Sequence, residues 1–480
     1  MSKIGRIQAG ILKGGMALIL IGTFDSAFAG GYDVNGIGHR ARAMGGAFTG
    51  LADDWSAAYY NPAGCAFLES SEFHLGGAAM TPRIDYVPNL SLNNWKLNNM
   101  APGKYGNIDI TAIVPQIGGY AKLPDAWGTN IGFAFYAPID NEMRWNLFNP
   151  HYTIDSSFGQ RFPAPDTESD INVWTGQPTI GMQVAKDRLS LGLGLVVNYA
   201  NISQHRVQIV DAPGESSGLP TPDGGKSFTD GIVEGSGWGM GYNLGMLAKI
   251  NQWSIGAAFQ SKVVHNLDGR STNRFWSHSV AGRGELTDPL IEQDLLNGKT
   301  HTAIQDIELE MTTPPRLSLG FAYEANKTFR VTGDIVYTWY AHVPGIILTE
   351  NDLVTFKFGD VGDAATLTLS NSEHYDWENQ YRLAIGSEWD ASGVLQFRAG
   401  YSFEPSMVEN SGLTPLQPHV GSKHSPSVGA SIKVGKYQFN GTYGLVAYEN
   451  NIVDTQTDNN LPGAYGGVQH DVFLSLSYRW

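Results

Sequence analysis

The sequence predicts an all-β protein: a 14-stranded antiparallel transmembrane β-barrel with a small N-terminal hatch, or plug, inside the lumen. Three observations predict this fold. Apolar and polar residues alternate along many stretches, the connections between these stretches alternate between short and long, and the chain ends on an alternating strand that closes with Trp480. Outer-membrane barrels combine these features, because each strand turns one face to lipid and the other to the lumen.

The last strand shows the pattern most clearly. One face carries Val472, Leu474, Leu476, Tyr478 and Trp480, and the other carries Asp471, Ser475, Ser477 and Arg479, with Phe473 as the single exception. A strand with one apolar and one polar face fits a lipid-facing wall around a polar lumen. We expect the barrel-assembly machinery of the outer membrane to engage this strand through Trp480.

Fourteen alternating stretches are found, an even number, as a closed bacterial barrel requires. The predicted strands are 72–80, 114–123, 129–138, 172–186, 189–205, 235–250, 253–270, 303–325, 329–343, 378–390, 395–405, 423–434, 436–449 and 468–480. Tight turns alternate with long, polar connections, so short turns gather at one end of the barrel. An even strand count then places both mature termini on the short-turn side, which is periplasmic in barrels of this kind.

The first 29 residues are predicted to be a cleaved secretory signal peptide. Three basic residues precede the apolar run Met16–Phe24, and Ala27-Phe28-Ala29 is a small-x-small cleavage site. Nine largely apolar residues are too few to cross a bilayer as a helix, which needs about 20. The predicted organisation is therefore a signal peptide at 1–29, a hatch at 30–70 and a barrel at 71–480.

The composition excludes several functions. The formal net charge of −15 argues against nucleic acid as a partner. Cys65 is the only cysteine, which excludes a disulfide within the chain and a multi-cysteine metal site. Residues 214–218 match the Gly-x-Ser-x-Gly pattern of hydrolases, but they lie in a predicted loop instead of a strand-turn-helix. We expect no enzyme activity, no cofactor and no metal.

Residues 30–70 do not alternate and are rich in glycine and alanine. A barrel of fourteen strands is wider than the roughly 8 strands whose side chains can fill the interior, so it needs a plug to exclude water. Small residues would let this segment pack closely against the wall. A disordered periplasmic tail is the alternative, but Trp55, Tyr59 and Tyr60 give the segment more aromatic content than such tails carry.

The segment also resembles a known family. The runs Gly45–Asp54 and Tyr60–Gly64, which include Asn61, Pro62 and Ala63, are similar to the N-terminal hatch of the FadL/TodX outer-membrane channels for long-chain fatty acids and other hydrophobic compounds. The resemblance implies a monomeric channel for passive uptake, with ligand capture by the loops, a luminal binding site and gating by the hatch. The Asn-Pro-Ala motif, Asp53 and Asp54 are the candidate gating residues.

Further candidate residues follow from the predicted faces. The luminal charges are Arg316, Arg330, Asp334, Arg382, Glu388, Arg398 and Arg479. Either they form a structural lattice of ion pairs, or one or two of them, for which we name Arg382 and Arg398, bind a carboxylate head group. Trp145 and Phe148 in the second long loop, with Phe275 and Trp276 in the fourth, are candidates for ligand capture. Pro138 is predicted to end and distort the third strand, where the family has its exit.

Two other functions stay open at this stage. A general diffusion porin would share the barrel, and a barrel-embedded lipid hydrolase or adhesin would carry its activity on the loops. The hatch argues against the porin, and no convincing Ser and His pair supports the hydrolase. The ligand itself, which could be a fatty acid, an alkane or a monoaromatic compound, is not specified by the sequence.

Overall fold

The fold is described from a computed structural model. It describes Val34 and residues 36–92, 100, 102–124, 128–147, 165–211, 226–276, 300–350, 353–358, 365–370, 373–374, 377–406, 421–454 and 461–480. The predicted signal peptide and Phe148 lie outside these residues. No helix among the described residues is long and apolar enough to span a bilayer.

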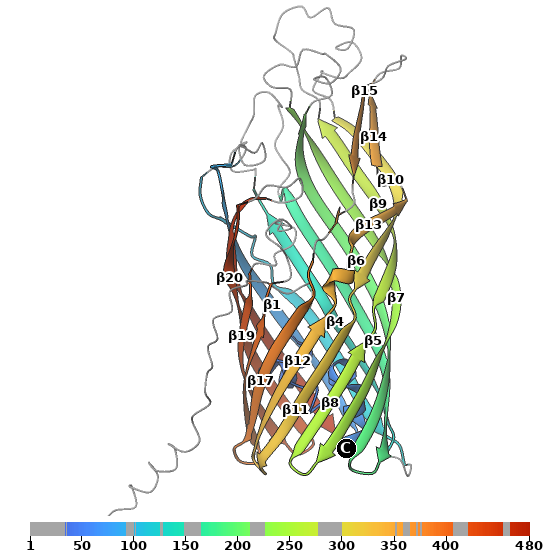
Figure 1. The fold of residues 1–480 in the computed structure, drawn as a ribbon, viewed down its shortest axis with the longest axis vertical. Coiled ribbons are helices and arrows are strands. Elements are labelled where there is room, and N and C mark those ends of the chain that lie inside the picture. The colour runs from blue at the N-terminus through green and yellow to red at the C-terminus, as the bar shows by residue number, and fades with distance from the viewer. Residues whose placement is uncertain are drawn as a thin grey trace, which may run out of the picture.

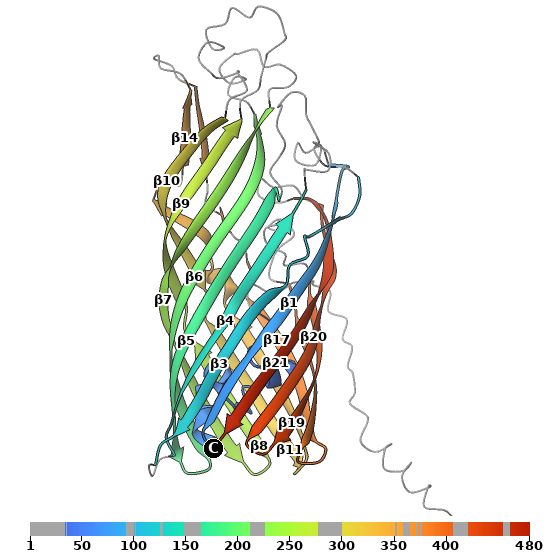
Figure 2. The ribbon, with the colours of Figure 1, turned by 180° about the vertical axis from the view of Figure 1, so that it is seen from behind.

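The structure is a closed antiparallel barrel, and the predicted count of fourteen wall strands is confirmed (Figures 1 and 2). Four of the wall strands are interrupted and carry two labels each. In order around the wall the strands are β1 (Glu72–Pro88), β3 (Ala112–Lys122), β4 (Asn130–Trp145), β5 (Thr167–Ala185), β6 (Leu189–Asp211), β7 (Lys226–Ile250), β8 (Trp253–Gln260) with β9 (Val263–Trp276), β10 (Thr300–Thr313) with β11 (Arg316–Asn326), β12 (Phe329–Thr338) with β13 (Gly345–Glu350), β16 (Glu373–His374) with β17 (Gln380–Asp390), β18 (Leu395–Glu404), β19 (Lys423–Val434), β20 (Tyr437–Val453) and β21 (Gly463–Arg479).

The first and last strands close the barrel. β1 pairs with β21 without a register break, from Glu72 opposite Arg479 to Pro88 opposite Gly463. Short connections lie at one end, which we call the turn end, and long ones at the other, the loop end; these are the lower and upper ends of Figure 1. Outside the wall, β2 (Tyr105–Gly106) pairs with β1, and β14 (Leu353–Phe358) and β15 (Ala365–Ser370) form a hairpin beyond the loop end (Figure 1).

Within the bilayer, the apolar residues of each alternating stretch face lipid and the polar or small residues face the lumen. On β6, Leu191, Leu193 and Leu195 are 44%, 48% and 49% exposed on the outer wall, whereas Ser190 and Asn198 are buried inside. In a membrane the exposed leucines contact lipid, so their burial is completed by the bilayer.

The strands extend further toward the loop end than predicted. β1 reaches Pro88 instead of residue 80, and β7 begins at Lys226 instead of residue 235. The pattern inverts in this region: on β1, Ile84 and Tyr86 are buried in the lumen while Arg83 and Asp85 face outward. Polar outward residues resemble loop sequence, so the prediction ended the strands too early.

Several expected loop positions are strand positions for the same reason. Trp145 was expected in the second loop, but it is the buried last residue of β4. Phe275 and Trp276 were expected in the fourth loop, but they are the last two residues of β9. Pro138 does not end the third strand. It lies within β4, where the register against β5 shifts by one residue between Tyr136 and Ile139.

Candidate functional site

The segment Gly36–Ser70, which we call the hatch, lies inside the turn half of the barrel, where its blue ribbon is visible between the strands in Figures 1 and 2. It contains the short helices α2 (His39–Ala43) and α3 (Ala57–Tyr60) and the 3-10 helix η2 (Pro62–Phe67). Its side chains and backbone bond to Asp471 on β21, Asp334 on β12 and Gln177 on β5. Only a segment in the lumen can reach strands on all sides of the wall.

A ring of inward-facing glycines gives the hatch its space. At each of these positions a Cβ atom would lie 2.6 Å or less from an atom of the hatch or, at Gly320, of Asp334, which binds the hatch. Such distances are shorter than van der Waals contact allows, so the wall carries no side chain where the backbone or a side chain of the hatch touches it. The ring consists of Gly118, Gly181, Gly192, Gly245, Gly256, Gly320, Gly386, Gly400, Gly429 and Gly444.

Wall side chains also satisfy the backbone of the hatch. Gln177 and Asn243 both donate to the carbonyl of Ala58, and Ser190 Oγ donates to the carbonyl of Ala63 over 2.8 Å. Buried carbonyls without partners would each cost about 1–3 kcal/mol. The polar lumen of the turn half is therefore a set of hydrogen-bond partners for the hatch.

The Asn-Pro-Ala motif joins two parts of the hatch to the wall. Asn61 is fully buried, and its Nδ2 donates to the carbonyls of Thr49 at 2.9 Å and of Met246 on β7 at 3.0 Å. Its Oδ1 accepts from the Ala63 N–H at 3.1 Å and so caps η2, while Pro62 occupies the first turn, where it needs no hydrogen bond.

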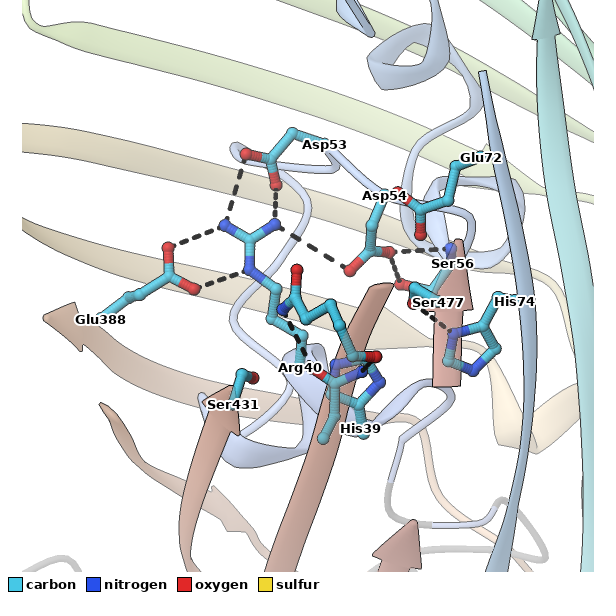
Figure 3. Close-up of polar contacts among 12 residues, drawn as sticks. His39, Arg40, Asp53, Asp54, Ser56, Glu72, His74, Glu388, Ser431 and Ser477 are labelled. Atoms are coloured by element: carbon cyan, nitrogen blue, oxygen red, sulfur yellow. Dashed lines mark hydrogen bonds and ion pairs between the residues drawn. The ribbon is translucent and has the colours of Figure 1, made fainter. Parts of the chain in front are cut away.

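An ion-pair cluster fixes the other side of the hatch (Figure 3). Arg40 of α2 binds both oxygens of Glu388 on β17 at 2.7 and 2.8 Å, and it also pairs with Asp53. Arg330 of β12 contacts Asp53 at 3.1 Å, and Arg398 of β18 contacts Glu388 at 2.6 Å. Guanidinium and carboxylate groups are thus matched across the interface between hatch and wall.

The two hatch carboxylates differ in their surroundings. Burial opposes ionisation of Asp53, but Arg40 and Arg330 outweigh it and hold the pKa of Asp53 below its usual value. Burial raises the pKa of Asp54, which accepts hydrogen bonds from the backbone N–H of Ser56 at 2.9 Å and from its hydroxyl at 2.6 Å. Asp53 therefore serves as an ion-pair partner, and Asp54 orders the turn before α3.

A second ion pair and a stack of rings attach α2 to the closing strands. Arg42 Nη2 lies 2.8 Å from Asp471 on β21, and both side chains are excluded from solvent. Beside them His39 stacks on His74 of β1 with 5.4 Å between ring centroids, and His74 stacks on Trp55 with 4.6 Å. The hatch is held to the seam where the barrel closes.

The loop half of the lumen has a different character. Its inward side chains form one buried apolar cluster, which we call the apolar lining. The lining draws on most of the wall, from β1 and β4 through β10 and β13 to β21. Its members include Tyr86, Ile139, Met143, Trp145, Ile171, Ile202, Leu267, Leu309, Met311, Tyr340, Ile346, Trp377 and Tyr465. Many of these side chains point inward from strands whose neighbouring outward residues are polar.

A small pocket lies between the apolar lining and the hatch, with a volume of about 40 Å³. Tyr340, which belongs to the lining, forms one side, and Tyr59 and Tyr60 of the hatch form another. Two arginines from the wall, Arg316 and Arg382, also face it. The remaining pocket residues are Val34, Ser318, Val336, Thr338, Gln380 and Glu404.

A sequence profile of the family described as "Outer membrane protein transport protein (OMPP1/FadL/TodX)" matches residues 21–440. The chain belongs to this family. The long-chain fatty acid transport protein of Escherichia coli is 23% identical over 455 residues, which cover 90% of this chain and 93% of that protein. Among solved structures, a Pseudomonas aeruginosa FadL homologue superposes with a TM-score of 0.69 at 16% identity, covering 94% of this chain and 99% of that one. The Pseudomonas putida toluene transporter TodX gives 0.62 at 16% identity, with the same coverage.

FadL/TodX proteins are transport channels and not enzymes, so this chain is an outer-membrane β-barrel of a Gram-negative bacterium that transports hydrophobic compounds. The described residues contain no cluster of three or more His, Cys, Asp or Glu side chains that could hold a metal ion.

The candidate ligand arginines occupy different environments in this FadL/TodX channel. Arg382 lies on the pocket, whereas Arg398 is buried in the ion-pair cluster with Glu388 and does not line the pocket. Arg316, which also appeared among the predicted luminal charges, is the second arginine of the pocket. Arg330 and Arg479 pair with carboxylates, so most of the luminal arginines do form the structural lattice that was the alternative.

Docking of the hatch is predicted to weaken as the pH falls below about 6.5. Burial, with further contributions from His74, Arg398 and Arg40 that outweigh Glu388, holds the pKa of His39 well below its usual value. An undocked His39 takes up a proton near pH 6.5 and a docked one does not, so each further unit of pH costs about 1.4 kcal/mol of docking free energy until the lowered pKa is reached.

Single-channel recordings between pH 7 and pH 5 measure this effect as an increase in open time. The His39→Asn variant keeps a hydrogen-bonding group near Ser475, to which His39 Nδ1 bonds at 2.9 Å, but cannot be protonated. An equal pH response in this variant would assign the effect to other groups.

Proposed function

We propose that this channel carries long-chain hydrophobic compounds, with fatty acids as the leading class, passively from the cell exterior toward the periplasm. The apolar lining is the observation that carries the proposal. A channel for sugars or ions needs a water-filled, polar lumen, whereas here the loop half presents buried apolar side chains from most of the wall. The curated relative in Escherichia coli is named as a long-chain fatty acid transporter.

In this proposal the loop end faces the exterior and captures the ligand. The ligand moves along the apolar lining, whose member Trp145 lies at the end of β4, and halts at the pocket above the hatch. The turn end and both mature termini face the periplasm. Phe148, Phe275 and Trp276 remain candidates for capture, the protein acts as a monomer, and Trp480 on the terminal strand engages the assembly machinery.

The hatch is proposed to act as the gate. Apart from its chain connection to β1, the hatch is held in the lumen by non-covalent contacts: apolar packing, hydrogen bonds and ion pairs such as those of Asp53 and Arg42. It can therefore leave the lumen without breaking a covalent bond. Asn61 connects it to β7, and loss of that contact would weaken the attachment of η2, which Ser190 and Gln183 also bind through its backbone carbonyls. The register shift at Pro138 gives a second candidate exit through the wall of β4, because a bulge locally removes ladder hydrogen bonds.

The uptake of a radiolabelled long-chain fatty acid by cells that lack their own channel tests the proposal. Ile202 is fully buried in the apolar lining, and Ser203 follows it on the outer face of β6. We expect Ile202→Glu to reduce uptake at least about tenfold, because a buried unpaired carboxylate is costly to dehydrate beside an apolar ligand. Ser203→Glu adds the same charge to the same strand and should leave uptake unchanged.

Uptake measurements in the same cells also distinguish the proposed channel from a general diffusion porin. Heat-dependent mobility in gel electrophoresis first shows that both variants are folded. Permeation of small sugars without uptake of fatty acids or hydrocarbons would contradict the proposal and support general diffusion. Uptake that is equally fast in both variants would mean that the ligand does not pass along the apolar lining.

A further inference from the structure

We propose that the turn end of the barrel binds anionic phospholipids, and that lysines in the turns hold the phosphate groups on the outer side of the wall. The inference rests on one part of the proposed function, the orientation in which the turn end faces the periplasm, and it does not depend on the transported compound. The leaflet that an outer membrane presents to the periplasm consists of phospholipids, and some of them carry a net negative charge.

Lys436, in the turn between β19 and β20, has the best-defined surroundings (Figure 2). Its Nζ lies 5.9 Å from the centre of the Tyr478 ring. Tyr478 in turn packs against Tyr437 and Trp480, with 5.1 and 5.6 Å between ring centroids. Tyr437 and Trp480 are 49% and 55% exposed on the lipid-facing side of the wall. The ammonium group therefore lies at the edge of an aromatic surface that faces lipid, and not in the lumen.

The space beside Lys436 is open to a ligand. A Cβ atom at the neighbouring Gly435 would meet no atom within 4 Å. Among the described residues no carboxylate forms an ion pair with Lys436. A phosphate group can therefore approach the ammonium group while the acyl chains of the same lipid lie along Val434 and Phe439, which are exposed on the lipid-facing side.

Two further turns repeat this arrangement in part. Lys327 lies between β11 and β12, close in sequence to Phe329, and Phe329 is the cross-strand partner of the exposed Trp389. Lys186 lies between β5 and β6, next to the exposed Val184. Both lysines are exposed, and neither forms an ion pair within the part of the chain that the structure describes. We call Lys186, Lys327 and Lys436 the turn lysines.

Several cations on the outer wall of the loop half differ, because they already have carboxylate partners. Arg83 lies 3.7 Å from Asp109, and Arg144 lies 2.7 and 2.6 Å from Glu142 and Glu168. The chain as a whole has a formal net charge of −15, so an excess of basic residues does not explain the unpaired lysines at the turn end. Lysines at a membrane surface attract anionic head groups, and aromatic neighbours keep them at the level of those head groups.

Native mass spectrometry of the full-length protein in detergent measures lipid binding directly. We expect phosphatidylglycerol to be retained at least about tenfold more than phosphatidylcholine with the same acyl chains, and Lys436→Gln to reduce this preference about threefold. Replacing all three turn lysines with glutamine should abolish the preference. Retention of phosphatidylcholine should not change, which shows that the variants are folded.

Lys249→Gln is the matched control. Lys249 is also an exposed lysine at the turn end, but its Nζ lies 4.2 Å from the centre of the Phe67 ring in η2, so it faces the hatch and not the lipid. This variant should keep the full preference for phosphatidylglycerol. Raising the NaCl concentration from about 0.05 M to about 0.5 M should weaken the preference in the natural chain, because salt screens exposed charges.

Three results would overturn the proposal: equal retention of the two lipids by the natural chain, a preference that survives in the triple variant, or an equal loss of preference in Lys249→Gln. Excess glycerol phosphate, which has the head-group chemistry without acyl chains, should not displace the lipid. Displacement would assign the turn lysines to soluble phosphates and would also overturn the proposal. Transport is not measured in these experiments, so each of these results leaves the proposed function intact.

Discussion

Replacing Gly192 with valine is expected to expel the hatch and leave an open pore. A Cβ atom at Gly192 would lie 2.2 Å from the backbone nitrogen of Ala63 and 2.2 Å from the backbone carbon of Pro62. Backbone atoms cannot move aside as a flexible side chain can, so docking should lose about 3 kcal/mol or more. That shift favours the undocked state by roughly a hundredfold.

Planar-bilayer recordings measure the effect as steady open current in a protein that otherwise opens rarely. Gly441→Val is the matched control, because Gly441 lies on the outer face of β20 and its only near contact is a side-chain atom of Leu474 at 3.7 Å. The wall should fold in both variants, since valine is well suited to strands. A closed channel in Gly192→Val would mean that the hatch tolerates displacement from the wall without opening a path.

Replacing Arg42 with methionine is expected to destabilise the docked hatch by about 3–5 kcal/mol, because it leaves Asp471 buried without its cation. Methionine is of similar length and keeps the apolar stem, so the loss reports on charge more than on packing. Cys65 lies fully buried in η2, so the docked hatch protects its thiol from a maleimide. The rate at which a maleimide labels Cys65 therefore follows the undocked population and should rise at least about a hundredfold.

The double variant Arg42→Met with Asp471→Asn provides the control. It removes both charges, and since paired neutralisation of a buried ion pair is often close to neutral in free energy, most of the protection of Cys65 should return. If the double variant were as reactive as Arg42→Met alone, the lost contact would be packing of the arginine stem and not the ion pair.

The lipid-embedded part of the fold is predictable from sequence because the bilayer imposes one rule on every strand. Leu191 and Leu193 alternate with Gly192 and Ser190, and the predicted start of β6 at residue 189 is confirmed. Beyond the bilayer the pattern is the opposite, because the apolar residues face inward and form the apolar lining while polar residues face outward. The inward Ile84 and outward Arg83 show why the ends of the strands were missed.

The site is only partly predictable, because it depends on register between distant strands. Arg382 and Arg398 look equivalent in sequence. In the barrel, Arg398 lies opposite Gly429 and forms an ion pair with Glu388, whereas Arg382 donates a hydrogen bond to the hatch. The glycine ring was also missed. The 58 glycines of the chain indicate it, because many of them occupy inward strand positions. A water-filled lumen would not require glycine at these positions.

Photolabelling with a diazirine-bearing long-chain fatty acid tests the central claim, that hydrophobic compounds pass through the loop half of the lumen. Mass spectrometry of the labelled protein would locate the reacted residues. The account predicts labels on the apolar lining, at Met143, Met311 and Tyr340, that excess unlabelled acid removes. Labels confined to outward residues such as Leu193 and Met240, with none in the lumen, would contradict it.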